Sequence, residues 1–130
     1  MIGLETSIVV RFPTQDDPIQ SPRATEIIKR RLTGENPGFV SIVAMVETVW
    51  VLEGAYRLAA NEIAAAVERM LQTDVLDVEN EREVFRAVIA LKEGQGSFAD
   101  AVIAALGTKA GCCTLTFDQK ALRLSGFEFS

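Results

Sequence analysis

The chain has 130 residues, of which 48% are hydrophobic and 24% charged, and its formal net charge is −5. This length and balance predict one folded domain over residues 1–130. The negative charge argues against a broad basic surface for nucleic acid, and the absence of histidine excludes Ser-His-Asp hydrolysis, Cys-His proteolysis and zinc–histidine sites. Carboxylates must therefore carry any catalysis.

The predicted elements begin with a short apolar strand at residues 2–4, and the sequence leaves open whether residues 8–12 stay extended. A polar loop over residues 13–18 comes next. Ser21, as a preferred N-cap residue, then predicts a helix that Gly34 ends.

Helical and strand-like segments alternate along the rest of the chain. The predicted strands lie near residues 39–40, 75–78, 113–117 and 127. The predicted helices start at the N-caps Ser41, Asn61, Asn80 and Ser97, the last covering 98–109, and a short turn surrounds Ala121. Strands separated by helices predict a three-layer α/β/α fold with a small, mainly parallel sheet.

The cysteines and the N-terminus indicate the cellular setting. Residues 1–5 lack the basic segment of a secretory signal, and charged residues interrupt every apolar run before the roughly 18 residues that cross a bilayer. We expect a cytoplasmic protein with no membrane partner. The adjacent Cys112 and Cys113 are badly placed to join distant segments, so we expect them reduced and partly buried in the core.

Four carboxylates lie against apolar sequence, where an unpaired charge is costly: Glu5, Glu47, Asp100 and Asp118. Glu5 follows the first strand and Asp118 the last, so both would emerge at the carboxyl edge of a parallel sheet and meet if their strands are neighbours. Glu47 lies in a helix with almost no polar face, and we do not expect its side chain to reach solvent. Asp100 lies in the first turn of another apolar helix.

Three of these acids have a simpler structural interpretation. Asp100 can favour the positive end of its helix dipole, a contribution of about 0.3–1 kcal/mol. Asp118 can be an ordinary helix cap, and Glu5 can be a turn residue. The sequence leaves these alternatives open, whereas Glu47 favours a paired or functional role.

The four acids, in this order and setting, resemble the PIN-domain family, and more closely its VapC-type toxin branch. The matching stretches are residues 2–7 (Ile-Gly-Leu-Glu-Thr-Ser), 41–47, 97–104 and 115–118. Each stretch is short, but the four occur in register, and the resemblance extends over essentially the whole chain. The family usually has Asp where this chain has Glu5.

The resemblance implies a homodimer with a pocket of acids that binds Mg²⁺ or Mn²⁺ and cleaves RNA as a metal-dependent endoribonuclease, inhibited by a cognate antitoxin. Carried over by position, the catalytic and metal-binding acids are Glu5, Glu47, Asp100 and Asp118, and the supporting polar residues are Thr6, Ser7 and Thr116. Asp118 would help to hold a second metal ion or its waters. Mg²⁺ prefers oxygen ligands and keeps several waters, so a few carboxylates hold it and leave positions for a phosphate.

Glu5 predicts weakened catalysis, because its extra methylene moves the carboxylate outward and a misplacement of ~1 Å can cost on the order of 10²-fold in rate. A catalytically silent PIN-fold protein that binds an antitoxin or RNA without cleaving it is therefore the second hypothesis. A phospho-accepting receiver domain is a third. This third hypothesis explains less. A receiver needs an acidic pair after its first strand, where this chain has Glu5-Thr6-Ser7, and the hypothesis gives Glu47 no role.

Overall fold

The computed structural model describes residues 1–14 and 20–129. In chain order its elements are β1 (Ile2–Gly3), α1 (Thr6–Val9), α2 (Gln20–Arg31), β2 (Gly38–Val40), α3 (Ile42–Gly54), α4 (Ala60–Leu71), β3 (Leu76–Val78), α5 (Glu81–Lys92), α6 (Phe98–Lys109), β4 (Thr114–Thr116), the 3-10 helix η1 (Gln119–Arg123) and β5 (Phe127–Phe129). Most of the predicted loop over residues 13–18 lies outside the described residues.

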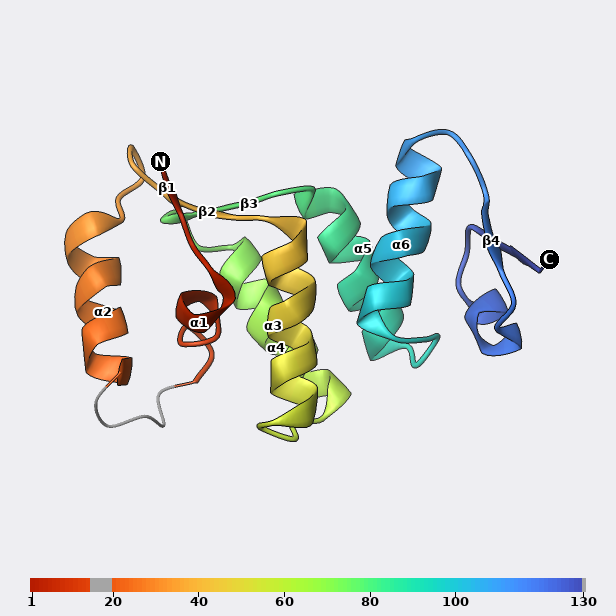
Figure 1. The fold of residues 1–130 in the computed structure, drawn as a ribbon, viewed down its shortest axis with the longest axis horizontal. Helices are drawn as coiled ribbons and strands as arrows, with labels where there is room; N and C mark the ends of the chain where they lie inside the picture. Colours follow the sequence, from red (N-terminus) through yellow and green to blue (C-terminus); the bar gives the residue numbers. More distant parts are fainter. Residues whose placement is uncertain (15–19, 130) are drawn as a thin grey trace.

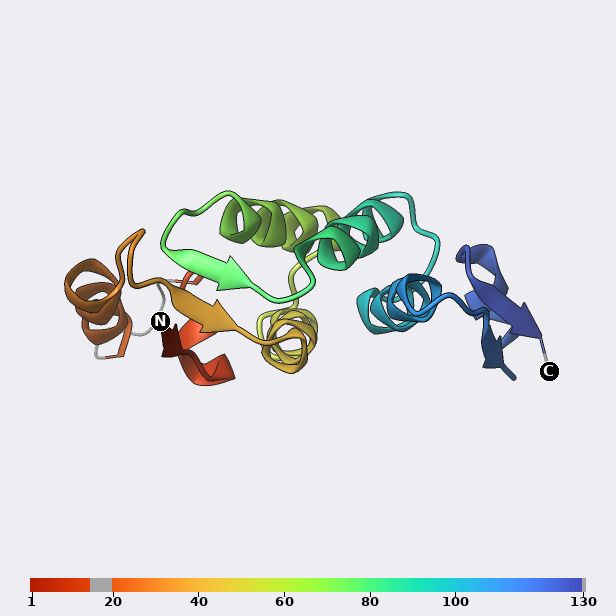
Figure 2. The same ribbon diagram turned by 90° about the horizontal axis from the view of Figure 1, so that it is seen from above.

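All strand pairs are parallel, as predicted, but the strands form two sheets. One sheet has the order β1-β2-β3, and the second consists of β4 and β5. Figures 1 and 2 show the two sheets at different ends of the molecule, with α3, α5 and α6 between them. The predicted α/β class with a small parallel sheet is confirmed, and β1 and β4 are not neighbours.

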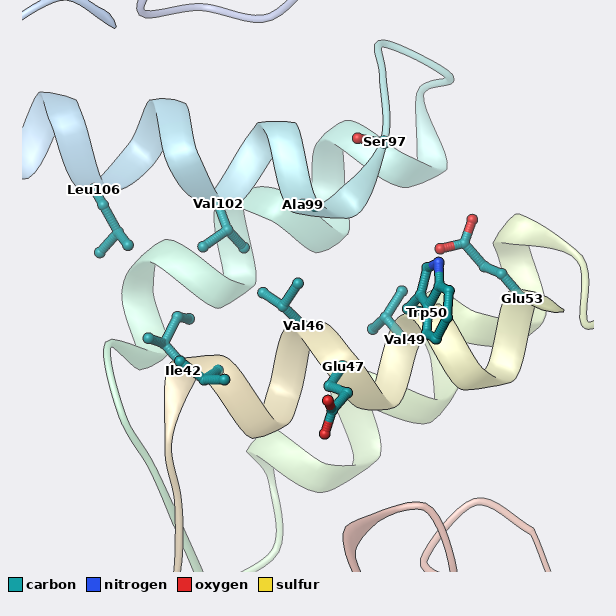
Figure 3. Close-up of a pocket in the computed structure, with 11 residues that line it drawn as sticks. Ile42, Val46, Glu47, Val49, Trp50, Glu53, Ser97, Ala99, Val102 and Leu106 are labelled. Carbon is teal, nitrogen blue, oxygen red and sulfur yellow. The ribbon is translucent and has the colours of Figure 1, made fainter. Parts of the chain in front are cut away.

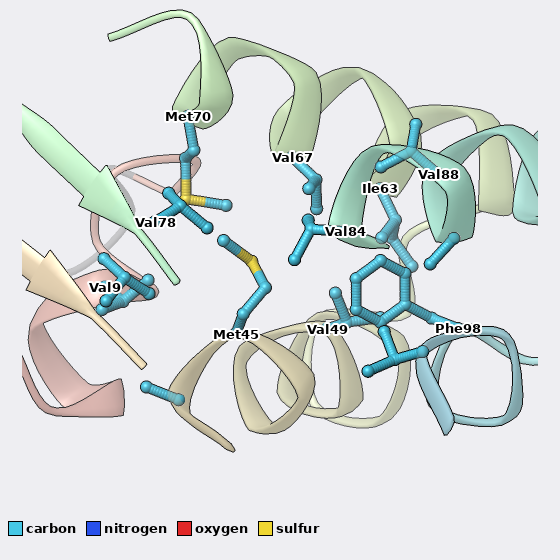
Figure 4. Packing of buried hydrophobic residues seen from close by; sticks show 14 of the residues in the cluster. Val9, Met45, Val49, Ile63, Val67, Met70, Val78, Val84, Val88 and Phe98 are labelled. Carbon is cyan, nitrogen blue, oxygen red and sulfur yellow. The ribbon is translucent and has the colours of Figure 1, made fainter. Parts of the chain in front are cut away.

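The core lies between α3, α4, α5 and the first turns of α6. Phe98 of α6, Met45 and Val49 of α3 and Ile63 of α4 are almost completely buried, and Figure 4 shows them packed against one another. Burial on β3 alternates, because Leu76 and Val78 are buried and Asp77 between them is exposed. One face of the three-stranded sheet therefore packs on this core.

The C-terminal unit, which we define as β4, η1 and β5, is attached to α6. Gly126, at φ +99°, lies so close to α6 that an added Cβ would be 3.3 Å from the carbonyl oxygen of Ala104 and 3.0 Å from Thr108 Oγ1. A Cβ on Gly107 of α6 would lie 2.3 Å from Thr114 Oγ1 of β4. Close packing of glycine backbone thus holds the unit against α6.

Several local predictions need correction. Residues 6–9 form α1, so the segment after the first strand does not stay extended. The fourth helix begins at Ala60 rather than after Asn61, because the side chain of Glu62 accepts a hydrogen bond from the amide of Ala59. Cys112 and Cys113 are free, as expected, but both are exposed, since the turn after α6 lies on the surface instead of in the core.

Candidate functional site

Glu5 is the N-cap of α1, directly after β1. Its Oε1 accepts hydrogen bonds from the backbone amide of Ser7, at 3.2 Å, and from Ser7 Oγ, at 2.6 Å. These two bonds hold the pKa of the Glu5 carboxyl below its ordinary value of 4.5, because they stabilise the charged form. The hydroxyl bond has the larger effect and the amide bond the next largest. The carboxylate is exposed and can accept further ligands.

Thr6 connects the first strand to the helix that carries Glu47. Its side chain is buried, and its hydroxyl donates a hydrogen bond to Glu47 Oε1 across the contact between α1 and α3. Glu47 itself is exposed, so the expectation that its side chain avoids solvent was wrong. The carboxylate lies on the solvent side of α3 because the opposite side, with Met45, Thr48 and Val49, enters the core.

Asp100 lies in the first turn of α6, where its amide donates a hydrogen bond to the N-cap Ser97 Oγ at 3.1 Å. Asp118 is the exposed N-cap of η1 and accepts a hydrogen bond from the amide of Lys120 at 2.9 Å. The amide of Asp118 in turn donates to Thr116 Oγ1 at 3.0 Å. Both acids thus also have the capping or helix-end position that the simpler interpretation gave them.

The structure therefore brings only part of the predicted constellation together. Thr6 joins the surroundings of Glu5 and Glu47, whereas Asp118 belongs to the separate C-terminal unit (Figure 1). Within residues 1–14 and 20–129, no three Asp, Glu, His or Cys side chains are grouped closely enough to hold one metal ion.

A groove of about 650 Å³ runs between α3 and α6. Figure 3 shows Val46 and Trp50 of α3 on one wall, Val102 and Leu106 of α6 on the other, and Glu47 on the side of α3 turned away from α6. The lining is almost entirely apolar. Its full set is Ile42, Val43, Val46, Glu47, Val49, Trp50, Glu53, Ser97, Ala99, Val102 and Leu106.

Sequence reasoning did not single out this groove. The signal was present, because the helix around Glu47 is apolar almost all round and a helix has room to bury only part of such a surface. Val43 and Trp50 are accordingly 71% and 73% exposed. A large exposed aromatic side chain beside further apolar side chains is typical of an interaction surface.

The donor chemistry of Glu5 and Glu47 suits a hard divalent cation. Mg²⁺ is commonly held by one or two carboxylates together with waters and substrate phosphate oxygens. Two exposed carboxylates with a polar Thr6–Ser7 support supply such ligands, and the hydrogen bonds to Ser7 and Thr6 restrict their orientation. These residues fit a divalent metal ion of this kind, although the remaining acids stand apart.

Comparison with protein families gives a match to the PIN domain over residues 2–126. The match spans the three-stranded sheet, β4 and all four acids, and it ends just before β5. No curated protein matches the chain significantly.

Proposed function

Because the chain belongs to the PIN domain family, whose members are in general metal-dependent nucleases, we propose that it is an endoribonuclease that hydrolyses RNA phosphodiester bonds, as a toxin of the VapC type. The observation that carries the proposal is the Glu5–Thr6–Glu47 arrangement, found at the carboxyl end of β1 in a chain of this family. Carboxyl ends of parallel strands are where α/β proteins bind their ligands.

In this proposal Glu5 and Glu47 hold Mg²⁺ or Mn²⁺ as the cofactor, and Asp100 and Asp118 complete the site. When bound, such an ion lowers the pKa of a water and stabilises the charge that develops on the phosphorus oxygens. Ser7 fixes the Glu5 carboxylate, and Thr6 fixes that of Glu47. Thr116 supports Asp118 through the backbone, because its Oγ1 accepts a hydrogen bond from the Asp118 amide.

The partners belong to the proposal as well. We propose RNA as substrate, a cognate antitoxin as inhibitor, a homodimer as the working unit and the cytoplasm as the compartment. The apolar groove between α3 and α6, with Trp50 at its wall, supports a protein partner because such a surface is costly to leave in water. No helix in the described part of the chain is long and apolar enough to cross a bilayer.

A second candidate function is a silent PIN-fold protein that binds an antitoxin or RNA without cleaving it. Glu5 in place of the usual Asp and the separation of Asp118 from Glu5 favour it. Titration with Mn²⁺ discriminates the two, since a nuclease binds the metal saturably and a silent domain does not.

The proposed activity is tested with Glu47→Gln, and Glu53→Gln serves as a matched control. Both glutamates are exposed, belong to α3 and line the same groove, but only Glu47 accepts the hydrogen bond from Thr6. Residues that merely orient metal ligands are worth roughly 10- to 100-fold in affinity or activity, so loss of Glu47 is expected to cost at least as much.

The measurement is the rate of Mg²⁺-dependent cleavage of a fluorescent single-stranded RNA by antitoxin-free protein. Glu53→Gln is expected to cleave at the rate of the unchanged chain. Equal losses in both variants would point to the groove rather than to a metal ligand, and no cleavage by the unchanged chain with any divalent metal would leave the silent domain as the better account.

A further inference from the structure

Each of the two sheets has an open edge. β1 pairs only with β2, and the amides of Ile2 and Leu4 donate to the carbonyls of Pro37 and Phe39. Because backbone groups alternate in direction along a strand, the N–H and C=O of Gly3 point away from β2. The amide of Thr114 likewise donates to the carbonyl of Gly126 in front of β5. The N–H and C=O of the next residue, Leu115, therefore point away from β5.

The two open edges face the same side of the molecule. In Figure 2, β1 lies below β2 and β4 lies below β5. A twofold axis between the sheets would therefore place β4 of one copy against β1 of a second copy and, by symmetry, the reverse pair as well. One operation would satisfy both edges.

Pairing of β4 with β1 of its own chain would break contacts that the structure makes. The C-terminal unit is held on α6 by the close approach of Gly126 to Ala104 and of Thr114 to Gly107. α6 in turn is anchored in the core through Phe98, and α3 lies between it and β1 (Figure 1). A second copy needs none of these contacts to open.

The exposed surface is large enough for such an interface. Leu115 and Phe117, in and just after β4, are 65% and 86% exposed. The chain exposes 7753 Å², whereas a compact monomer of 14.2 kDa exposes about 6800 Å². The excess of roughly 1000 Å² is similar to what each partner buries in a standard-size interface, about 800 Å².

We propose that two copies of this chain exchange their C-terminal units, so that β4 of each copy pairs in parallel with β1 of the other and extends the sheet to five strands. In a parallel pair, a residue whose N–H and C=O point at the neighbouring strand lies opposite one whose groups point away, as Ile2 lies opposite Gly38. In this dimer Gly3 therefore lies beside Thr116 of the partner subunit. Glu5 follows β1, and Asp118 follows β4, at the same carboxyl edge of the composite sheet. Each carboxylate site is thus built from both chains, with Glu5 and Glu47 from one and Asp118 from its partner.

The strand exchange rests on open edges and exposed area alone, and only the shared site rests on the proposed function. The first experiment therefore does not depend on activity. Both chains carry Cys112→Ser and Cys113→Ser. An untagged copy also carries Gly3→Cys, and a longer, tagged copy carries Thr116→Cys. The two copies are coexpressed and oxidised. A Cβ on Gly3 meets nothing within 4 Å, so the substitution fits.

We expect a disulfide-linked heterodimer on a non-reducing gel, because neighbouring strands lie about 4.8 Å apart, within the range of a disulfide. Glu81→Cys, exposed at the start of α5, replaces Gly3→Cys in the control and should give no such band. A band of equal strength in the control, no band at all, or an intrachain disulfide in a monomeric Gly3→Cys/Thr116→Cys double variant would each overturn the exchange.

The second experiment tests the shared site by coexpression of Glu5→Ala and Asp118→Ala chains. If the site combines two chains, half of the randomly formed dimers keep one of two sites intact, and about a quarter of the activity of the unchanged protein returns. A site within one chain predicts no recovery. If the disulfide forms but even the unchanged dimer cleaves no RNA, the proposed function fails and the strand exchange stands.

Discussion

The hydroxyl of Thr6 donates a hydrogen bond to Glu47 Oε1 and so connects two segments that lie 41 residues apart in the sequence. Thr6 is buried where α1 meets α3, while Glu47 reaches solvent. A buried polar group needs such a partner, and a carboxylate that must hold a cation gains a defined orientation from it. The contact therefore has both a structural and a functional consequence.

Thr6→Val keeps the shape of this side chain and removes its hydroxyl. We expect a loss of about 1 kcal/mol in the free energy of unfolding, the typical net value of one hydrogen bond, and a lower rate of RNA cleavage because Glu47 is no longer oriented. Urea denaturation and cleavage assays measure the two effects. Thr6→Ser is expected to restore the cleavage rate, and failure of that rescue would assign Thr6 to packing alone.

Glu5→Asp shortens the side chain to the length that is usual in the family. We expect faster metal-dependent cleavage, because displacement of a ligand by ~1 Å can cost on the order of 10²-fold in rate. Initial rates of purified, antitoxin-free protein check this result, with Glu81→Asp on the exposed surface of α5 as control. Equal or lower activity of Glu5→Asp would contradict the prediction and show a site adapted to glutamate.

Ser7→Ala removes the hydroxyl that contributes most to the lowered pKa of Glu5. We expect the pKa of Glu5 to rise toward 4.5. A lowered folded-state pKa favours the folded state above the pKa of the unfolded chain, and this contribution disappears as the pH falls through the folded-state pKa. Carbon NMR titration of the carboxyl without metal measures the shift, and an unchanged pKa would show that the bond from the Ser7 hydroxyl does not persist in solution.

Gly126→Ala tests how the C-terminal unit is held. The residue has φ +99°, and an added Cβ would press on Ala104 and Thr108 of α6, so we expect a destabilisation of about 1–3 kcal/mol. Gly54→Ala, at the end of α3 with open space around it, should instead stabilise by roughly 0.4–1 kcal/mol. Urea denaturation of both variants decides, and a harmless Gly126→Ala would place the unit away from α6.

Short-range features were predictable from the sequence, because they depend on neighbours a few residues away. Ser41 and Ser97 are N-caps in the structure, as expected, and α6 has the predicted bounds. A cap needs only its own hydroxyl and an amide three residues on, and the glycine beyond the helix supplies its end. Parallel pairing likewise follows from strands separated by helices.

Long-range features were decided by the tertiary structure. The sequence placed an acid after β1 and another after β4, but it could not say that the two strands belong to different sheets. Glu47, Cys112 and Cys113 are exposed, although their apolar neighbours suggested burial. The local sequence pattern indicates which side chains can be buried. The packing of distant helices and the pairing of strands determine which side chains are buried, because the stabilising contacts join segments that lie far apart in the chain.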